Sequence, residues 1–150
     1  MCNVWMPLEP VRADDGLEFL KGSHRWGKVF APINFRTHEI FEGVGADYPA
    51  MLAVEAERKR YEFLTFALEP GDCLVFDLRT LHHASAGARP PDKTIRRMTL
   101  LFAREDTIFK PRGPWTRETS DYLIAQGQGI GAKVGCPLLP KVWQREAHSR

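Results

Sequence analysis

The sequence predicts a mainly β protein, a jelly roll or a related barrel. Apolar and polar residues alternate with a period of two in several short segments, which is the pattern of half-buried strands. Turn-forming Gly, Pro and Asp residues separate these segments at close spacing. A length of 150 residues is enough for one domain with its own core. We therefore expect a single domain, with barrel strands over about residues 3–103 and a Pro/Gly-rich tail over residues 104–150.

Five segments carry this alternation. In the first, Val4, Met6 and Leu8 fall on one side, and Pro7 and Pro10 indicate an edge or irregular strand because proline lacks the ladder donor. The expected strands cover residues 3–8, 17–20, 61–68, 73–77 and 95–103. Between and after them we expect loops over residues 26–46 and 84–94, a helix over residues 49–60 and a short helix near residues 120–126.

The most informative stretch is GDCLVFDLRTLHH, residues 71–83. Leu74 and Phe76 alternate with polar or smaller residues, and a straight continuation of this strand puts Thr80 and His82 on their face. A neutral imidazole at the inner mouth of a barrel suits a first-row metal. A histidine at a strand end can equally be a hydrogen-bonded or solvated side chain, and this stretch alone leaves both interpretations open.

Composition excludes several classes of function. The net charge of +2 is too small to indicate a nucleic-acid or anionic-membrane partner, and no apolar run approaches the length of a membrane span. Three cysteines without metal-type spacing favour a reducing, cytoplasmic location. The glycine-rich run at residues 127–131 lacks the preceding strand and following helix of a phosphate-binding loop, and the four tryptophans are interpreted as packing residues.

Four blocks of the sequence resemble successive parts of the phytanoyl-CoA dioxygenase family. They are VWMPLEPVRADDGLEFLKGSHRWG, RYEFLTFALEPGDCLVFDLRTLHHASAG, RRMTLLFA and GCPLLPKVWQ, and they span most of the chain in the family's order. The resemblance implies a double-stranded β-helix, a cupin-like jelly roll, that binds Fe(II) and 2-oxoglutarate and hydroxylates a small organic substrate. It also implies a metal held by a His-x-Asp pair and a distal histidine, the facial triad of non-haem iron oxygenases.

The resemblance assigns His82 to the distal metal ligand, while His83 occupies a position that the family usually fills with glycine or alanine. It also implies an arginine on the following strand that holds the distal carboxylate of 2-oxoglutarate through its planar guanidinium. Arg96 and Arg97 compete for this role. We favour Arg97 because it shares strand parity with Thr99, in an arginine-x-serine-like arrangement.

The chain departs from the family pattern in one respect. No His-x-Asp or His-x-Glu occurs in it, so we expect an N-terminally truncated dioxygenase domain that is inactive or weakly active alone. His24, His38 and His148 lack ligand-like neighbours, and Asp77 is expected on the wrong strand face. Two alternatives stay open: a metal-free jelly-roll binding module or degenerate copy of the oxygenase, and a cupin-like isomerase or sugar-binding barrel. The latter needs ligand spacing that the sequence does not contain.

Overall fold

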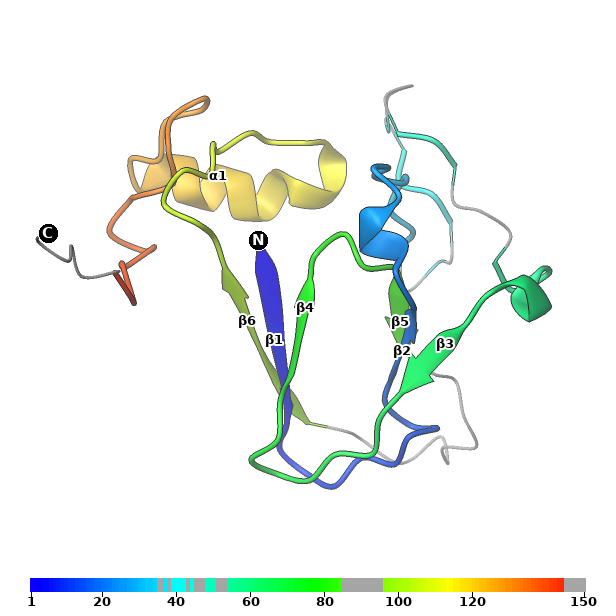
Figure 1. Ribbon diagram of the computed structural model, residues 1–150. Helices are drawn as coiled ribbons and strands as arrows, with labels where there is room; N and C mark the ends of the chain where they lie inside the picture. The colour runs from blue at the N-terminus through cyan, green and yellow to red at the C-terminus, as the bar shows by residue number, and fades with distance from the viewer. Residues whose placement is uncertain are drawn as a thin grey trace, which may run out of the picture. The chain divides into compact units, whose positions relative to one another are not determined.

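The computed structural model describes residues 1–34, 37, 39–42, 44, 48–50, 54–84 and 96–144. The chain divides into two compact units (Figure 1). The first unit comprises Met1–Ala31 and Tyr48–Phe102, and the second comprises Pro32–Asp47 and Ala103–Arg150. Among the described helices, none has the length and apolar character needed to cross a membrane.

The first unit contains two antiparallel sheets of three strands each that face one another (Figure 1). In the first sheet the order is β4-β1-β6, and in the second it is β3-β2-β5. The strands are β1 (Cys2–Pro7), β2 (Leu17–Leu20), β3 (Phe63–Thr65), β4 (Leu74–Asp77), β5 (His82–Ala84) and β6 (Arg97–Phe102). The prediction of a mainly β protein is therefore confirmed, whereas a complete jelly roll goes beyond these six described strands and stays a proposal.

The core of the first unit lies on the inner face of β1. Trp5 packs there with Val11 and Leu68, and partly buried Leu74 and Phe76 lie against them. The side of β1 singled out by Val4, Met6 and Leu8 is the opposite one, and Leu8 is 53% exposed. Both sides of β1 carry mostly apolar residues. The side with Trp5 faces the core because burial of the large indole removes more apolar surface from water than burial of the opposite side would.

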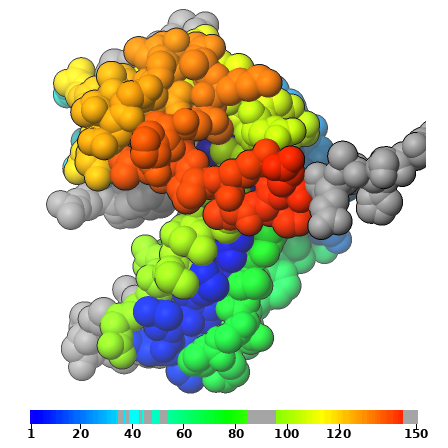
Figure 2. Space-filling view, turned by 90° about the vertical axis from the view of Figure 1, so that its left-hand side faces the viewer, coloured from blue at the N-terminus to red at the C-terminus, as the bar shows by residue number. Residues whose placement is uncertain are grey.

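The outer face of the first sheet is open to solvent. Figure 2 shows β6, β1 and β4 side by side on this face, at the lower part of the view. Val75 and Leu100 both pair with Val4 and are 62% and 42% exposed. The outer face of this sheet is therefore apolar and against water. On the other face the core lies at β1 and β4, whereas β6 is exposed there too, with Leu101 opposite Asn3 61% exposed.

The central stretch does not continue as a straight strand. It ends at Asp77, whose Oδ1 accepts a 2.8 Å hydrogen bond from Arg79 N, while Thr80 N donates to Asp77 O at 2.9 Å. These bonds form a tight turn, a common use of aspartate, and the chain then enters the second sheet as β5. The expectation of one straight strand that carries Leu74, Thr80 and His82 on the same face was therefore wrong. The chain turns after Asp77, and His82 lies on a strand of the other sheet.

The expected helix over residues 49–60 is wrong for the part that the structure describes, where a single 3₁₀ turn, Arg58–Arg60, is present. Residues 51–53 lie outside the described residues. In the second unit, α1 spans Arg117–Ala125, close to the predicted short helix. The side chain of the buried Gln128 links the glycine-rich run to the residues that follow it. Its Nε2 donates to Lys133 O at 3.0 Å, and its Oε1 accepts from Gly135 N at 2.9 Å.

Candidate metal and cosubstrate site

His82 lies on the inner face of the second sheet. It pairs with Phe19 across β2 and β5, and paired residues of neighbouring strands share a face. Its ring stacks on Phe19, with centroids 5.9 Å apart, and meets the Phe76 ring of the opposite sheet at 4.9 Å. Phe19 is 5% exposed, so this face belongs to the interior. The imidazole therefore lies between the two sheets.

Hydrogen bonding fixes the tautomer of His82. Its Nδ1 lies 2.8 Å from the carbonyl oxygen of Thr80, which can only accept, so Nδ1 carries the proton in this bond. The lone pair is then on Nε2, for which the described residues provide no hydrogen-bond partner. Metal-binding histidines commonly donate their other ring N–H to a backbone carbonyl in this way. His82 is therefore prepared to act as a ligand through Nε2.

The opposite wall carries polar groups on the inner face of the first sheet. Asn3 and Trp5 are 9% and 5% exposed, and neither Asn3 Oδ1 nor Trp5 Nε1 has a hydrogen-bond partner among the described residues. Thr99 pairs with Trp5 and Arg97 pairs with Pro7, so register puts both on this face. Buried polar atoms without partners are uncommon and call for an explanation. A polar ligand between the sheets would satisfy them.

Arg96 and Arg97 differ in their surroundings. Arg96 bonds to the carboxylate of Glu9, whereas Arg97 forms no ion pair with any described residue. Arg96 directly precedes β6, and alternation puts it on the side opposite to Arg97. Strand register puts Arg97 and His82 on the facing sides of the two sheets, where His82 is half-buried and Arg97 is exposed.

An apolar cavity of about 340 Å³ lies beside this site. Phe19 and Phe76, the two rings that contact His82, form part of its wall. Leu64 and Phe66 bound it on one side, and Lys21, His24 and Thr80 contribute polar groups at its lining. Volumes in this range accommodate small organic ligands.

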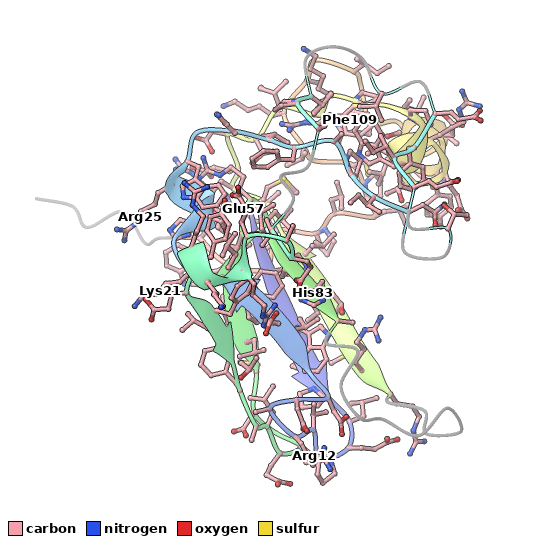
Figure 3. All side chains as sticks on the ribbon, turned by 90° about the vertical axis from the view of Figure 1, so that its right-hand side faces the viewer. Arg12, Lys21, Arg25, Glu57, His83 and Phe109 are labelled. Atoms are coloured by element: carbon pink, nitrogen blue, oxygen red, sulfur yellow. The ribbon has the colours of Figure 1, made fainter. Side chains whose placement is uncertain are left out.

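His83 points away from the interior, on the outer side of the second sheet (Figure 3). Its Nε2 lies 2.9 Å from Glu18 Oε2, and its Nδ1 lies 3.0 Å from Ala84 O. Arg58 bonds to the other Glu18 oxygen and to Glu55, at 3.2 Å from Glu55 Oε1. The Arg58 hydrogen bond lowers the pKa of Glu18, burial of the carboxyl opposes this, and His83 adds to the lowering.

This outer cluster has the composition of a metal site but not its electrostatics. One ligand atom each from Glu18, Glu55 and His83 lies within 4.8 Å of the others. The guanidinium of Arg58 occupies the space between the two carboxylates and compensates their charge. A cation would have to displace it, so we interpret the cluster as an ion-pair network.

The remaining candidates lie elsewhere. Asp77 belongs to the turn after β4, and the Arg79 side chain and amide lower its pKa to about 2. His24 lines the apolar cavity, and His38 and His148 lie outside the described residues.

The sequence analysis did not single out Asn3 and Trp5 as candidate site residues. The available signal was an asparagine that alternation puts on the same strand face as the indole of Trp5.

Among the described inner-face residues, one side chain, that of His82, is a candidate iron ligand. His82 offers a suitable nitrogen, but in the described ranges the only cluster of three His, Cys, Asp or Glu side chains is the outer one. Of the donors that a carboxylate accepts, the Trp5 N–H is buried on the inner face, whereas the Thr99 hydroxyl and the Arg97 guanidinium share the register of this face but are exposed.

Comparison with protein families gives a match to the model described as Phytanoyl-CoA dioxygenase (PhyH) over residues 1–90. The match covers more than half of the chain, which therefore belongs to the phytanoyl-CoA dioxygenase family. His82 lies inside the matched region and Arg97 outside it. Neither the curated proteins nor the solved structures give a match.

Proposed function

We propose that the chain forms part of the site of an Fe(II)- and 2-oxoglutarate-dependent dioxygenase that hydroxylates a small organic substrate. Family membership supports this class of reaction. The single observation that carries the proposal is the Nε2 lone pair of His82, fixed by Thr80 on an inward strand face. In such enzymes the iron brings 2-oxoglutarate and dioxygen together, and decarboxylation of 2-oxoglutarate supplies the oxidant.

Each residue has a defined task in this proposal. His82 donates Nε2 to the metal, and the Thr80 carbonyl holds the ring in the required tautomer. Arg97 binds the distal carboxylate of 2-oxoglutarate with two parallel hydrogen bonds, which a lysine cannot reproduce. Trp5 Nε1 and the Thr99 hydroxyl lie next to it in the strand register and supply further donors.

A second function is favoured by one observation. Within the described residues His82 has no companion ligands, and the sole three-residue cluster of potential ligands is held by Arg58. A jelly-roll binding module that holds a carboxylate ligand without iron would satisfy the Trp5 N–H and the Arg97 guanidinium equally well. The two functions differ in whether a metal reaches His82.

Paramagnetic broadening by Mn(II) distinguishes them even when binding is weak. The ring signals of the histidines are followed by NMR as Mn(II) and 2-oxoglutarate are added to the chain. We expect the His82 signals to broaden first, because a paramagnetic ion relaxes the ring that it ligates. His83→Ala, which removes the neighbouring imidazole on the opposite face, should leave this broadening unchanged. Broadening of His83 with His82 unaffected would locate the metal in the outer cluster and contradict the assignment.

Succinate release with Fe(II), 2-oxoglutarate and ascorbate tests the chemistry. One described ligand binds a first-row ion weakly, so we expect slow release by this chain, abolished in His82→Ala and reduced in Arg97→Lys. Release that persists in His82→Ala would contradict the role of His82. A lack of both release and broadening would favour the metal-free module.

A further inference from the structure

A second hollow lies in the first unit, beside the segment that follows the 3₁₀ turn Ser23–Arg25. It has a volume of about 380 Å³ and is lined by Trp26, Lys28, Phe30 and Tyr61. None of these residues lines the cavity beside His82. The hollow is therefore separate from the proposed oxygenase site, and neither the family match nor the proposed function accounts for it.

Three aromatic rings surround this hollow. The Trp26 and Phe30 centroids are 6.4 Å apart with planes at 82°, and the Trp26 and Tyr61 centroids are 6.0 Å apart with planes at 42°. Phe30 is buried, whereas Trp26 and Tyr61 are half-buried and keep part of their surface open to a ligand. Rings at these mutual angles present both faces and edges, which suits a planar aromatic guest.

Three donors in the lining have no partner among the residues that the structure describes. Neither Lys28 Nζ, Trp26 Nε1 nor the Tyr61 hydroxyl makes a hydrogen bond or ion pair with the described residues. By contrast, the nearby Lys21 is neutralised by Glu62 at 2.7 Å. The hollow thus combines an aromatic wall with a positive charge that no described residue compensates, which disfavours a quaternary ammonium guest and favours an anion.

The chain around the hollow is held in place by backbone bonds. Ser23 Oγ donates to Leu20 O and accepts from Leu81 N, both at 2.8 Å. Trp26 N donates to Ser23 O at 3.1 Å, and Ala31 N donates to Pro49 O at 2.9 Å. Both ends of the Trp26–Phe30 segment are therefore anchored, so a ligand meets a largely formed pocket.

We propose that Trp26, Lys28, Phe30 and Tyr61 form a binding site for a planar aromatic anion of one or two rings, such as an aromatic carboxylate or sulfonate. The ring of the ligand packs against Trp26, and its anionic group pairs with Lys28. Tyr61 and Trp26 provide further hydrogen-bond donors to that group. The site does not depend on iron or on 2-oxoglutarate.

The test is an NMR titration of the ¹⁵N-labelled 150-residue chain with 2-naphthalenesulfonate. The four indole N–H signals report separately on Trp5, Trp26, Trp115 and Trp143. We expect a saturable shift of the Trp26 signal. Lys28→Met should weaken binding by up to about fivefold, the value of one partly exposed ion pair. Lys59→Met removes another exposed lysine and serves as the matched control with unchanged affinity.

Benzyltrimethylammonium tests the sign of the charge. We expect it to bind more weakly than the sulfonate, and a tighter cation would overturn the assignment of an anion site. The site itself is refuted if the Trp26 signal does not shift, or if all four indole signals drift together without saturation. Because Lys28 is exposed, its substitution leaves the fold intact, which makes the comparison decisive.

Discussion

Asn3 illustrates, at the scale of one residue, a conflict between stability and binding. Its Oδ1 is buried in the first unit, where the described residues offer it no hydrogen-bond partner, and a buried polar atom of this kind costs about 1–3 kcal/mol. Such groups are uncommon and call for an explanation, for example a bound water, an ion or a functional role. The inner face of β1 therefore gives up stability at a position that a water or ligand with a hydrogen-bond donor would satisfy.

Asn3→Leu should stabilise the chain. Leucine has a similar size and no polar atom, so we expect the free energy of unfolding to rise by about 1 kcal/mol in urea denaturation without ligand. A drop in stability would show that Asn3 is satisfied by a group that leucine cannot replace.

The sequence identified only part of this residue-level picture. His82 was proposed from the strand pattern and from its family-like context, and Arg97 from the resemblance, with parity choosing it over Arg96, since alternation along a strand is a local property. Asn3 and Trp5 were missed because their burial depends on which face of β1 meets the second sheet. That choice is made by packing between strands distant in sequence, and both parities of β1 looked apolar.

At the scale of elements, Glu18 connects β2 to β5 and to the turn Arg58–Arg60. Its carboxylate meets His83 at 2.9 Å and also bonds to Arg58, so one buried group ties three segments together. His83 is adjacent to His82 on β5. The outer network thus helps to hold the strand whose inner face carries the candidate ligand.

Glu18→Gln should destabilise the chain at neutral pH and flatten its acid sensitivity. Because the folded pKa of Glu18 lies below its ordinary value of 4.5, its contribution is present above that value and is lost as pH falls through the lower folded pKa. We expect a loss of about 1–3 kcal/mol at pH 7, measured by urea denaturation across pH. The pKa of Asp77 is lowered from 3.8 to about 2, so the stability that Asp77 contributes is lost mainly below pH 3.8. Asp77→Asn is therefore the control that separates the effect of Asp77 from that of Glu18 in the more acidic part of the titration.

Equal acid sensitivity in the wild-type chain and Glu18→Gln would contradict this role. Arg58→Met completes a double-mutant cycle with Glu18→Gln, and a coupling energy near zero would show that the ion pair contributes nothing measurable. The exposure of Arg58 is expected to keep the coupling well below that of a fully buried pair.

The elements themselves were largely predictable, and their connections were not. Five of the six described strands lie where period-two alternation indicated them, because alternation is a local signal. The short strand β5 and the turn before it were missed. They depend on hydrogen bonds of Asp77 with Arg79 and on pairing of His82 with Phe19, which a straight-strand extrapolation ignores.

At the scale of the whole molecule, the sequence predicted the class but not the assembly of sheets. The strand orders β4-β1-β6 and β3-β2-β5 combine segments from both ends of the first unit. Such pairings are set by burial in three dimensions, and a one-dimensional pattern leaves them open. The same assembly leaves the outer face of the first sheet apolar, with Val75, Met98 and Leu100 exposed by 62%, 45% and 42%.

We predict that this face drives association with a second copy of the chain. Val75 and Leu100 flank Val4 across the sheet, and contiguous exposed apolar side chains of this kind usually mark a contact surface. Leu100→Lys should therefore lower the weight-average sedimentation coefficient toward that of a monomer at concentrations where the wild-type chain associates. Ile130→Lys, at a 66% exposed position of the second unit, is the matched control and should sediment like the wild type. If the wild-type chain is monomeric at all concentrations, or if both variants reduce association equally, the face of β4, β1 and β6 is not the contact surface.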